Sequence, residues 1–556
     1  MDYSKEYFTI ENLNGGTNTL TITKENLPAY YDTGGFAVGE PTGDADAAPA
    51  ITIYYSFDKT TWNILGTTST TALTVDFTDK IYLKATCDRW ATQLNAAKIW
   101  CSTNTIKCSL QHCFSGNIMS LLKGDNFVND NVLSSINYIF CGLFYNDVTL
   151  LNIDNLILSP QQLQGSCYLM MFYNCSGLTT LPEKLFSNVS ELIGSCFRLM
   201  FLNCTGLITV PKKLLPFNVM AKYCYVCMFY GCTSLITAPD LPATTLDFGS
   251  YYNMFYGCTS LITAPDLPAT ILTERCYYSM FNGCTSLIHP PKMAPTVVNT
   301  YSCAFMFNGC TSLLEPTILP ALTLASYCYQ AMFQDCESLQ YFPSLPATTL
   351  GDYCYAWMFY GCSSASNTIT LPATTLKTQC YRQMFGRCSS LQIAPELPAA
   401  TLTEYCYIAM FAYDTALIQA PKLKASFIPE GAYCSMFYGC INLNYIECHA
   451  LQISDVLTTD TKYGSGYTPV DTWLKSVMSV GTFVKHINMN DWTRGTSGIP
   501  TRWNVLYVDE NGTIYKGDIK TQPEFENVHP KEFKEFTDSQ DNITINEFKN
   551  FPLSLL

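Results

Sequence analysis

The chain has 556 residues, more than the roughly 250 to 300 at which a single compact core stops growing, so several domains or an elongated molecule are expected. Its formal net charge is −14, with 31 Lys and Arg against 45 Asp and Glu, which argues against the basic surface of a nucleic-acid-binding protein. No apolar run reaches the roughly 18 residues of a transmembrane helix, and an aromatic content of 14% is too high for a disordered chain.

Residues 1–95 have the alternating pattern of β-strands. Apolar and polar residues alternate in "YFTIENL" (residues 7–13) and "ITIYYSF" (residues 51–57), with turn residues between such segments, so we predict a small β-sandwich-like domain. The segment "SFDKTTW" (residues 56–62) is similar to an Asp-box turn but is one residue short and lacks its Gly, so we interpret it as a hairpin turn. The N-terminus has neither a basic segment nor an apolar stretch, and we therefore expect no standard secretory signal.

Residues 96–166 form a leader followed by degenerate first repeats, such as "GLFYNDVTLLNIDNL" (residues 142–156). Residues 167–448 then contain eleven copies of a motif centred on Met-Phe, and the last eight steps between copies are all 26 residues long. A period of this length is typical of stacked repeats that bury their apolar faces only against their neighbours. The Met residues of the copies are Met171, Met200, Met228, Met254, Met280, Met306, Met332, Met358, Met384, Met410 and Met436.

The constant positions of the motif predict a packed core. Cys224, Met228 and Cys232 are spaced by four residues, which places them on one face of a short helix. A Pro-containing extended segment follows, so we predict a mixed α/β solenoid, a leucine-rich-repeat array of 26-residue units. Cysteines eight apart on a helix lie about 12 Å apart, too far for a disulfide, which leaves buried free thiols or disulfides between adjacent repeats. Metal binding is disfavoured because Cys-x2-Cys spacing occurs once, at Cys224 and Cys227.

Three further positions of the motif bear on binding. Tyr recurs three residues before Met, and we interpret that column as structural, with an aromatic stripe for sugars or a protein partner as the alternative. Two residues after Met the side chain varies and is often aromatic, and twelve residues after Met it changes between acidic, basic and neutral, which predicts contact with solvent. The candidate binding residues from these two variable columns are Tyr230, Tyr256, Tyr360, Tyr438, Asp240, Asp266, Lys292, Glu396 and Lys422.

Residues 449–505 are expected to cap the last repeat. The segment "DTWLKSVMSV" (residues 471–480) is a plausible helix, and "GTFVKHI" (residues 481–487) a strand. Residues 506–556 begin with a hairpin signal, Asn511-Gly512 between alternating segments, and end in a tail that alternates charges with single aromatic residues. We interpret this tail as an anchoring or docking arm, with a frayed or surface-packed terminus as the alternative.

The segment "MFYGCTSLITAPDLP" (residues 228–242) resembles the BspA-like, or Treponema pallidum type, leucine-rich repeats, which carry a Phe-x-x-Cys-x-x-Leu run before a Pro-containing strand. It differs from them in two ways: it has Met-Phe where they usually have Ala-Phe, and its repeat of 26 residues is longer than theirs. The flanking segments at residues 115–127 and 473–505 are similar to those of such proteins in gut Bacteroidales and their tailed, crAss-like phages. The resemblance implies a surface or virion protein that adheres to something, and it brings no enzyme activity.

No catalytic motif stands out, and the five histidines show no metal-binding arrangement, so we expect no enzyme, cofactor or metal. The predicted function is that of a phage virion appendage, a head or tail fibre that displays the repeat surface for attachment to a bacterial surface protein or glycan. Made in the host cytoplasm, it would bind other virion proteins through its N-terminal domain or C-terminal tail, and by analogy it would form a homo-oligomer. The alternative is a bacterial cell-surface or secreted adhesin, and a third hypothesis is an enzyme acting on surface glycans.

Overall fold

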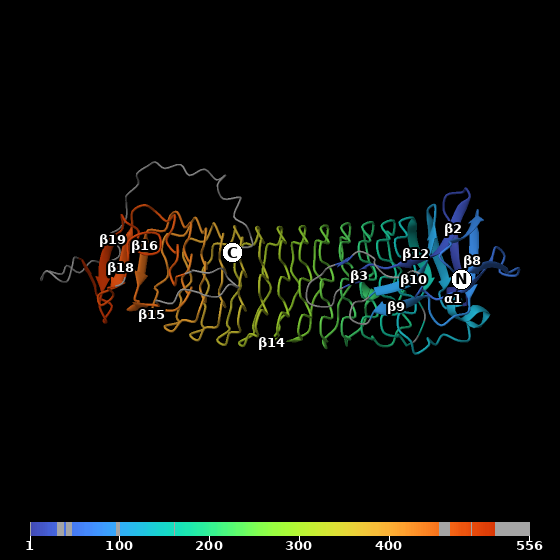
Figure 1. Ribbon diagram of the computed structural model, residues 1–556, viewed down its shortest axis with the longest axis horizontal. Coiled ribbons are helices and arrows are strands. Elements are labelled where there is room, and N and C mark those ends of the chain that lie inside the picture. Colours follow the sequence, from blue (N-terminus) through green and yellow to red (C-terminus); the bar gives the residue numbers. More distant parts are fainter. Residues whose placement is uncertain are drawn as a thin grey trace. The chain divides into compact units, whose positions relative to one another are not determined.

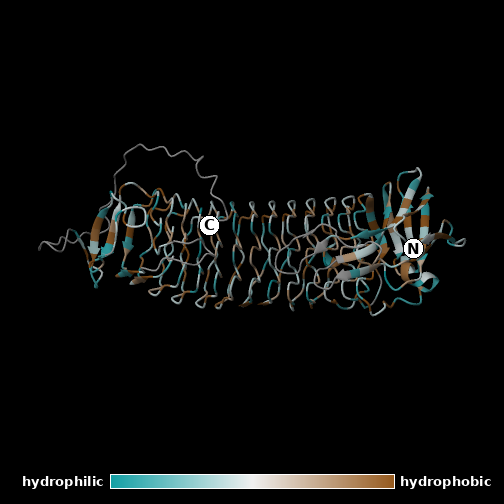
Figure 2. Cartoon of the chain, viewed as in Figure 1, coloured by the Kyte–Doolittle hydropathy of each residue, from teal (hydrophilic) through white to brown (hydrophobic). Residues whose placement is uncertain are grey.

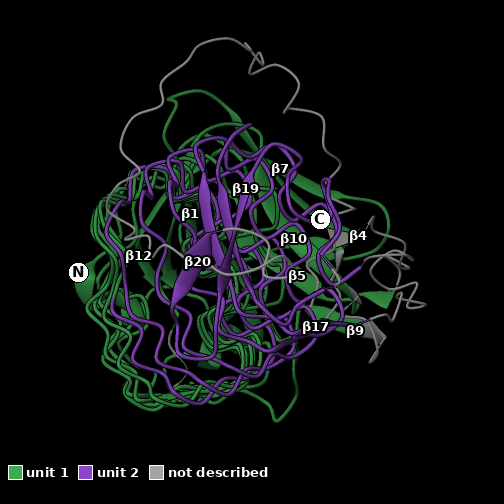
Figure 3. Ribbon diagram, turned by 90° about the vertical axis from the view of Figure 1, so that its left-hand side faces the viewer, with its two compact units in different colours: residues 1–343 green, residues 344–556 purple. Residues whose placement is uncertain are grey.

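The computed structural model describes residues 2–30, 38–39, 47–95, 100–158, 160, 162–454, 468–490 and 492–516. The chain divides into two compact units, residues 1–343 and 344–556, which Figure 3 shows in different colours. The described residues are almost entirely strand, turn and coil. Among them, the one α-helix is α1 (Ser120–Lys123), and short 3-10 helices include η1 (Tyr3–Lys5), η3 (Gly124–Asn126) and η4 (Lys212–Leu214). No described helix is long and apolar enough to cross a bilayer.

Two β-sheets form the N-terminal part of the first unit. The larger has the strand order β12-β11-β1-β8-β5-β6, and the smaller has the order β7-β2-β10-β9. Paired strands are antiparallel except β11 and β12, which are parallel. The strands are β1 (Phe8–Asn12), β2 (Asn18–Asn26), β5 (Thr52–Ser56), β6 (Asn63–Thr67), β7 (Leu73–Phe77), β8 (Lys80–Ala85), β9 (Ala91–Asn95), β10 (Trp100–Cys108), β11 (His112–Asn117) and β12 (Leu150–Ile157), with a separate pair β3 (Ala29–Tyr30) and β4 (Val38–Gly39).

The alternating sequence pattern corresponds to one buried and one outward face of these strands. In β8 every second side chain is buried, namely Ile81, Leu83 and Ala85. Figure 2 shows the same alternation as bands of apolar and polar colour along the strands. The segment 56–62 connects β5 to the antiparallel β6, so the hairpin turn predicted there is confirmed. The sheets continue through β10 and β11, past the domain end that the sequence places at residue 95.

The predicted mixed α/β solenoid with a leucine-rich-repeat helix in each unit is wrong. No α-helix lies among the described residues of 167–448, and the part of each copy around Met-Phe is a run of consecutive turns. The N–H groups of Cys224, Met228 and Cys232 each donate to a carbonyl three residues earlier, at 3.2 Å. An α-helix would require bonds to carbonyls four residues earlier.

The N–H groups between these positions bind the next copy instead. Tyr225 donates to the carbonyl of Ser250 at 3.1 Å, and Phe229 donates to that of Met254 at 3.0 Å. Alternate N–H groups therefore close a turn within one copy and join that copy to its neighbour, which leaves few orphaned backbone donors in this interior. Within each unit, successive copies lie side by side as loops (Figure 1).

The backbone conformation explains why a helical period appears in the sequence. Every fourth residue of the run has a positive φ, as in Tyr223 (57°), Cys227 (53°) and Gly231 (69°). A right-handed helix cannot include such residues, because its φ is near −63°. The turns nevertheless repeat every four residues, close to the 3.6 of a helix, so the positions −4, 0 and +4 share one face in either structure.

That shared face is the core of the repeat region. The Met and Phe of the eleven copies are all fully buried, and Phe rings of neighbouring copies stack, as Phe229 does on Phe255 with centroids 5.7 Å apart and planes 5° apart. The buried thiols act as donors: the Sγ of Cys258 donates to the carbonyl of Phe229 at 3.1 Å. All 27 cysteines are free, which confirms the buried-thiol interpretation and excludes disulfides between repeats in this structure.

Outside the turn runs, neighbouring copies are joined by short parallel pairs. β13 (Ile271–Leu272) pairs with β14 (Val297–Val298) in the first unit, and β15 (Phe427–Ile428) pairs with β17 (Gln452–Ile453) in the second. Single parallel bridges, such as Thr237 to Thr263, occur between other copies. The Pro residues of these segments remove donors and keep the pairings short.

The end of the second unit differs from the predicted cap. The segment expected to be a helix is another run of turns, in which the carbonyl of Trp473 accepts the N–H of Phe437 at 3.0 Å. Trp473 thus occupies the register of the repeat Met, is fully buried, and stacks on Trp492 with centroids 5.1 Å apart. The last sheet contains β16 (Tyr445–Cys448), which precedes this run, and β18 (Thr482–His486), β19 (Asn504–Val508) and β20 (Ile514–Lys516), which follow it. The predicted strand and hairpin are thus confirmed. The tail from residue 517 lies outside the described residues.

Candidate functional site

The Tyr column three residues before Met is part of the interior. Tyr225, Tyr251 and Tyr277 are each 1% exposed, and the ring of Tyr251 lies 5.8 Å from each of the other two, tilted by 32° against Tyr225 and stacked on Tyr277. In the second unit, Tyr381 and Tyr407 stack in the same way at 5.7 Å. Burial raises the pKa of these phenols well above the ordinary value. The structural interpretation of this column is confirmed, and the alternative of a stripe that binds sugars is wrong, because no ligand reaches buried rings.

The column twelve residues after Met lies on the surface. Asp240, Asp266 and Lys292 in the first unit are exposed, as are Glu396 and Lys422 in the second, which agrees with their variation in sequence. The ammonium group of Lys292 is 3.9 Å from the carboxylate of Asp266, and both side chains are well solvated, at 91% and 65% exposure. Such exposed pairs contribute roughly 0 to 1 kcal/mol to stability, so these charges remain available to a partner.

In the second unit the surface charges also pair with residues outside their column. The ammonium group of Lys422 is 3.3 Å from the carboxylate of Glu447, whose side chain is 5% exposed, and Glu396 lies 3.7 Å from Lys424. His449 contacts the same Glu447 carboxylate at 2.7 Å. Lys422 therefore has a structural partner, and of these candidates it is less available for binding than Asp240 or Lys292.

The column two residues after Met is half-buried and only partly a free surface. Tyr230 stacks on Tyr256 with centroids 4.6 Å apart and planes 1° apart, and burial raises the pKa of Tyr230 to about 12. Tyr230 also packs against an apolar cluster that includes Cys101 of β10 and Leu27, which follows β2. Rings stacked in this way cover one another's faces and present edges and hydroxyl groups to solvent.

The corresponding tyrosines of the second unit lie beside cations. The guanidinium of Arg387 is 5.5 Å from the ring centroid of Tyr360, and the ammonium group of Lys475 is 5.4 Å from that of Tyr438. Cation–π contacts of this kind contribute about 0.5 to 1 kcal/mol when exposed. The candidate binding residues thus lie in two columns of each unit, two and twelve residues after Met. The contacts described between candidates join residues of the same column.

One surface feature was missed by the sequence analysis. In the first unit, Lys222 lies 5.3 Å from the ring centroid of Phe248, and Arg275 lies 5.9 Å from the same ring and 5.2 Å from that of Tyr301. These residues stand five or six positions before the Met of their copies. Because basic residues occur there in only some copies, the comparison of copies gives no constant column that would mark them.

A second missed feature is a shallow groove of about 680 Å³ in the first unit. It is bordered by a row of Ile residues eight positions after Met and a row of Ser residues six positions after Met. Ile208 and Ile262 are 44% and 42% exposed, which is unusual for a row of large apolar side chains. The signal is present in the sequence as the repeated "TSLI".

The described residues offer little for catalysis or metal binding. Among them, no group of three or more His, Cys, Asp or Glu side chains could hold a metal ion. Burial raises the pKa of the thiols, for instance that of Cys224 to about 12, so they stay protonated and unreactive at neutral pH. His112 and Asp147 form a pair at 3.0 Å, but their side chains are 0% and 1% exposed, so no substrate can reach them.

Compared with known proteins, the chain matches no protein-family model and no curated protein. The resemblance to the BspA-like family therefore remains a prediction that rests on the motifs alone.

Proposed function

We propose that this chain is a non-enzymatic structural and binding protein that recognises its partner through the outward columns of the repeat region. The single observation that carries this proposal is the contrast between columns. The Met and Phe positions are fully buried and invariant among the copies, whereas the column of Asp240, Asp266 and Lys292 is exposed and changes its charge from copy to copy. Packing does not require such changes, whereas recognition of a partner uses them.

The biological setting that we propose is a phage virion, in which this chain is a head or tail appendage that attaches to a bacterial surface protein or glycan. The support is the resemblance of residues 115–127 and 473–505 to segments of Bacteroidales phage proteins. Other virion proteins would bind the N-terminal domain or the tail, which starts at residue 517 and lies outside the described residues. A homo-oligomer is part of this proposal by analogy with other appendages.

Mass spectrometry of purified particles and of the host cell envelope tests the setting. The proposal expects peptides of this chain in particles, at a fixed ratio to the major capsid protein after gradient purification. Recovery in the cell-envelope fraction, with none in particles, would support the bacterial adhesin instead.

A binding assay tests recognition independently of the setting. The purified chain is expected to bind bacterial surface material, and substitution of Asp240, Asp266 and Lys292 by Ala is expected to weaken that binding without unfolding the chain. Release of soluble sugar products from the material would contradict the non-enzymatic assignment.

A further inference from the structure

The turn between β5 and β6 presents an aromatic ring to solvent. Phe57 follows the last residue of β5 and is 51% exposed, although its side chain is large and apolar. Neighbouring apolar residues of the same sheet, such as Ile53 and Ile81, are completely buried. A single exposed ring is common on protein surfaces, so the surroundings of Phe57 decide whether it has a role.

The turn that carries Phe57 is held by its own side chains. The hydroxyl of Ser56 accepts the N–H groups of Asp58 and Lys59 at 3.2 and 2.9 Å. The carboxylate of Asp58 accepts those of Thr60 and Thr61 at 2.8 and 2.7 Å, and these bonds lower the pKa of Asp58. These bonds hold the backbone of the turn that carries Phe57, which reduces the entropy cost of ordering this turn when a ligand binds.

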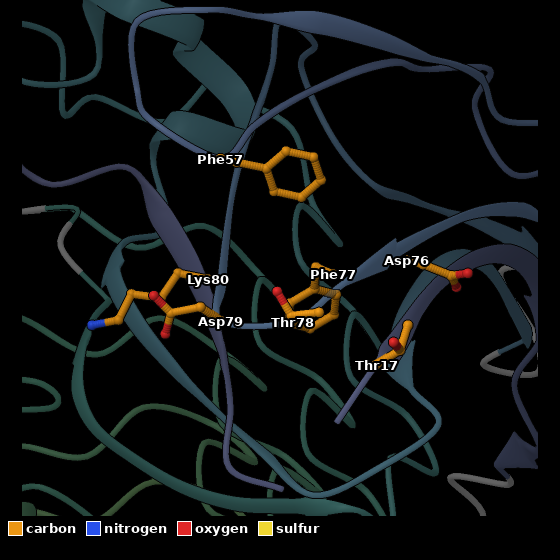
Figure 4. A pocket seen from close by; sticks show the side chains of 7 residues that line it. All are labelled: Thr17, Phe57, Asp76, Phe77, Thr78, Asp79 and Lys80. Carbon is orange, nitrogen blue, oxygen red and sulfur yellow. The ribbon is translucent and has the colours of Figure 1, made fainter. Parts of the chain in front are cut away.

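A cavity of about 340 Å³ lies next to this ring. It is lined by Phe57, by Thr17 before β2, and by the segment 76–80 between β7 and β8. Figure 4 shows the Phe57 ring on one side of an open space and Phe77 and Thr78 on the other, with Asp76 and Asp79 at its margins. Phe77 is 3% exposed and forms an apolar floor.

Phe57 differs from the tyrosine columns in the accessibility of its ring face. In those columns each ring covers its neighbour in parallel, as Tyr230 and Tyr256 do. The aromatic neighbour of Phe57 is Tyr55, and the two rings meet at 70°, so Tyr55 does not cover the Phe57 face in that way. A sugar ring needs such a face, because its axial C–H groups pack flat on an aromatic surface.

The charges around the cavity select against anions. Asp76 and Asp79 both contribute carboxylates to the lining, and the charge of Lys80 is offset because its ammonium group is 3.0 Å from the carboxylate of Glu11. The hydroxyl of Thr19 donates to the carboxylate of Asp76 at 2.7 Å, which keeps that group oriented. Carboxylates and threonine hydroxyls are suited to a neutral ligand that carries several hydroxyl groups.

We propose that Phe57, Thr17, Thr78 and Asp79 form a binding site for a neutral sugar unit, with the ring of Phe57 as the stacking surface. The site is in the N-terminal sheets and outside the repeat columns. A test of this site is therefore independent of any test of the function proposed for those columns.

Saturation-transfer NMR on the full chain tests this site with the methyl glycosides of glucose, galactose, mannose and N-acetylglucosamine. At least one of these sugars is expected to receive saturation through its ring C–H protons. Phe57→Ala is expected to raise its Kd about tenfold or more, Asp79→Asn to weaken binding, and Phe57→Trp to retain it.

Ile64→Ala is the matched control, because Ile64 is 67% exposed on β6 of the same hairpin and does not line the cavity. This variant is expected to bind as the parent does, and circular dichroism checks that all four variants are folded. The proposal is overturned if none of the four sugars receives saturation, or if Phe57→Ala binds as tightly as Ile64→Ala.

Discussion

Asp414 replaces the Cys that ten other copies carry four residues after Met, and it is completely buried. In neighbouring copies this Cys donates its S–H to a Phe carbonyl of the preceding copy: Cys388 to Phe359 at 3.1 Å and Cys440 to Phe411 at 3.0 Å. Asp414 accepts the N–H of Cys388 with Oδ1 at 2.7 Å, whereas Oδ2 is buried without a hydrogen-bond partner among the described residues. If Oδ2 of Asp414 carries a proton, its O–H group can act as the donor in this copy, in place of the Cys S–H group that the neighbouring copies have.

Burial is the main cause that raises the pKa of Asp414 well above its ordinary value. The folded chain therefore keeps a proton that the unfolded chain loses above pH of about 4. The free energy of unfolding then falls by about 1.4 kcal/mol for each pH unit above that value, until the folded carboxyl group itself titrates. The adjacent thiols of Cys388 and Cys440 also have pKa values raised by burial and do not titrate in this range.

Asp414→Asn is the perturbation that isolates this proton. The Asn oxygen can accept from Cys388 and its NH2 group can donate as the protonated acid does, but it does not titrate. We expect the variant to unfold at a higher urea concentration than the parent at pH 6 and to match it near pH 4. Between these values the gain grows by up to about 1.4 kcal/mol per pH unit until the folded carboxyl group of the parent titrates. Hydrogen exchange of peptides from residues 384–440 locates the effect.

Glu396→Gln is the control, because Glu396 is exposed and its neutralisation is expected to change stability by under about 0.5 kcal/mol. An equal difference between Asp414→Asn and the parent at pH 4 and pH 6 would refute the reasoning, since it would mean that Asp414 binds no extra proton on folding.

Four further outcomes follow from the fold. Gly283→Ala, at a φ of 73° with no close contact for the added methyl group, is expected to lower stability by about 1 to 2 kcal/mol in thermal unfolding. Phe255→Ala opens a cavity in the stacked column and is expected to cost about 3 to 5 kcal/mol, measured by urea unfolding of the first unit. Trp473→Ala is expected to cost a similar amount and to increase hydrogen exchange in the last repeat, because the Trp covers that repeat. Alkylation without reductant is expected to label few cysteines in the native chain and nearly all of the 27 after denaturation, and persistent protection after denaturation would mean disulfides.

The buried columns could be predicted from the sequence because eleven copies within one chain act as their own alignment. The spacing of Cys224, Met228 and Cys232 indicates a shared face, and the structure buries all three. The same spacing does not distinguish a helix from turns that repeat every four residues, because both place these side chains together. The signal against a helix was the Gly at position +3 of several copies, as in Gly231, because Gly adopts a positive φ without strain and is disfavoured in a helix interior.

The surface was harder to predict than the core. The variation of Asp240 and Lys292 correctly indicated solvent exposure, since no packing constraint acts on them. The variation at Tyr230 did not indicate a fully exposed side chain, because Tyr230 is partly buried against an apolar cluster. Contacts between parts of the chain that are distant in sequence produce no periodic pattern in the sequence, so they could not be predicted from the repeat.

The central claim is that the outward columns of the repeat region bind a partner while the inward columns only support them. An array of bacterial surface glycans and proteins, probed with the full chain and with the variant Asp240→Ala, Asp266→Ala, Lys292→Ala, tests it most directly. The account predicts that the full chain binds at least one class of array component, and that the variant loses that binding while its Tm stays within about 2 °C of the parent. Equal binding by both proteins, or no binding by the full chain, would contradict it.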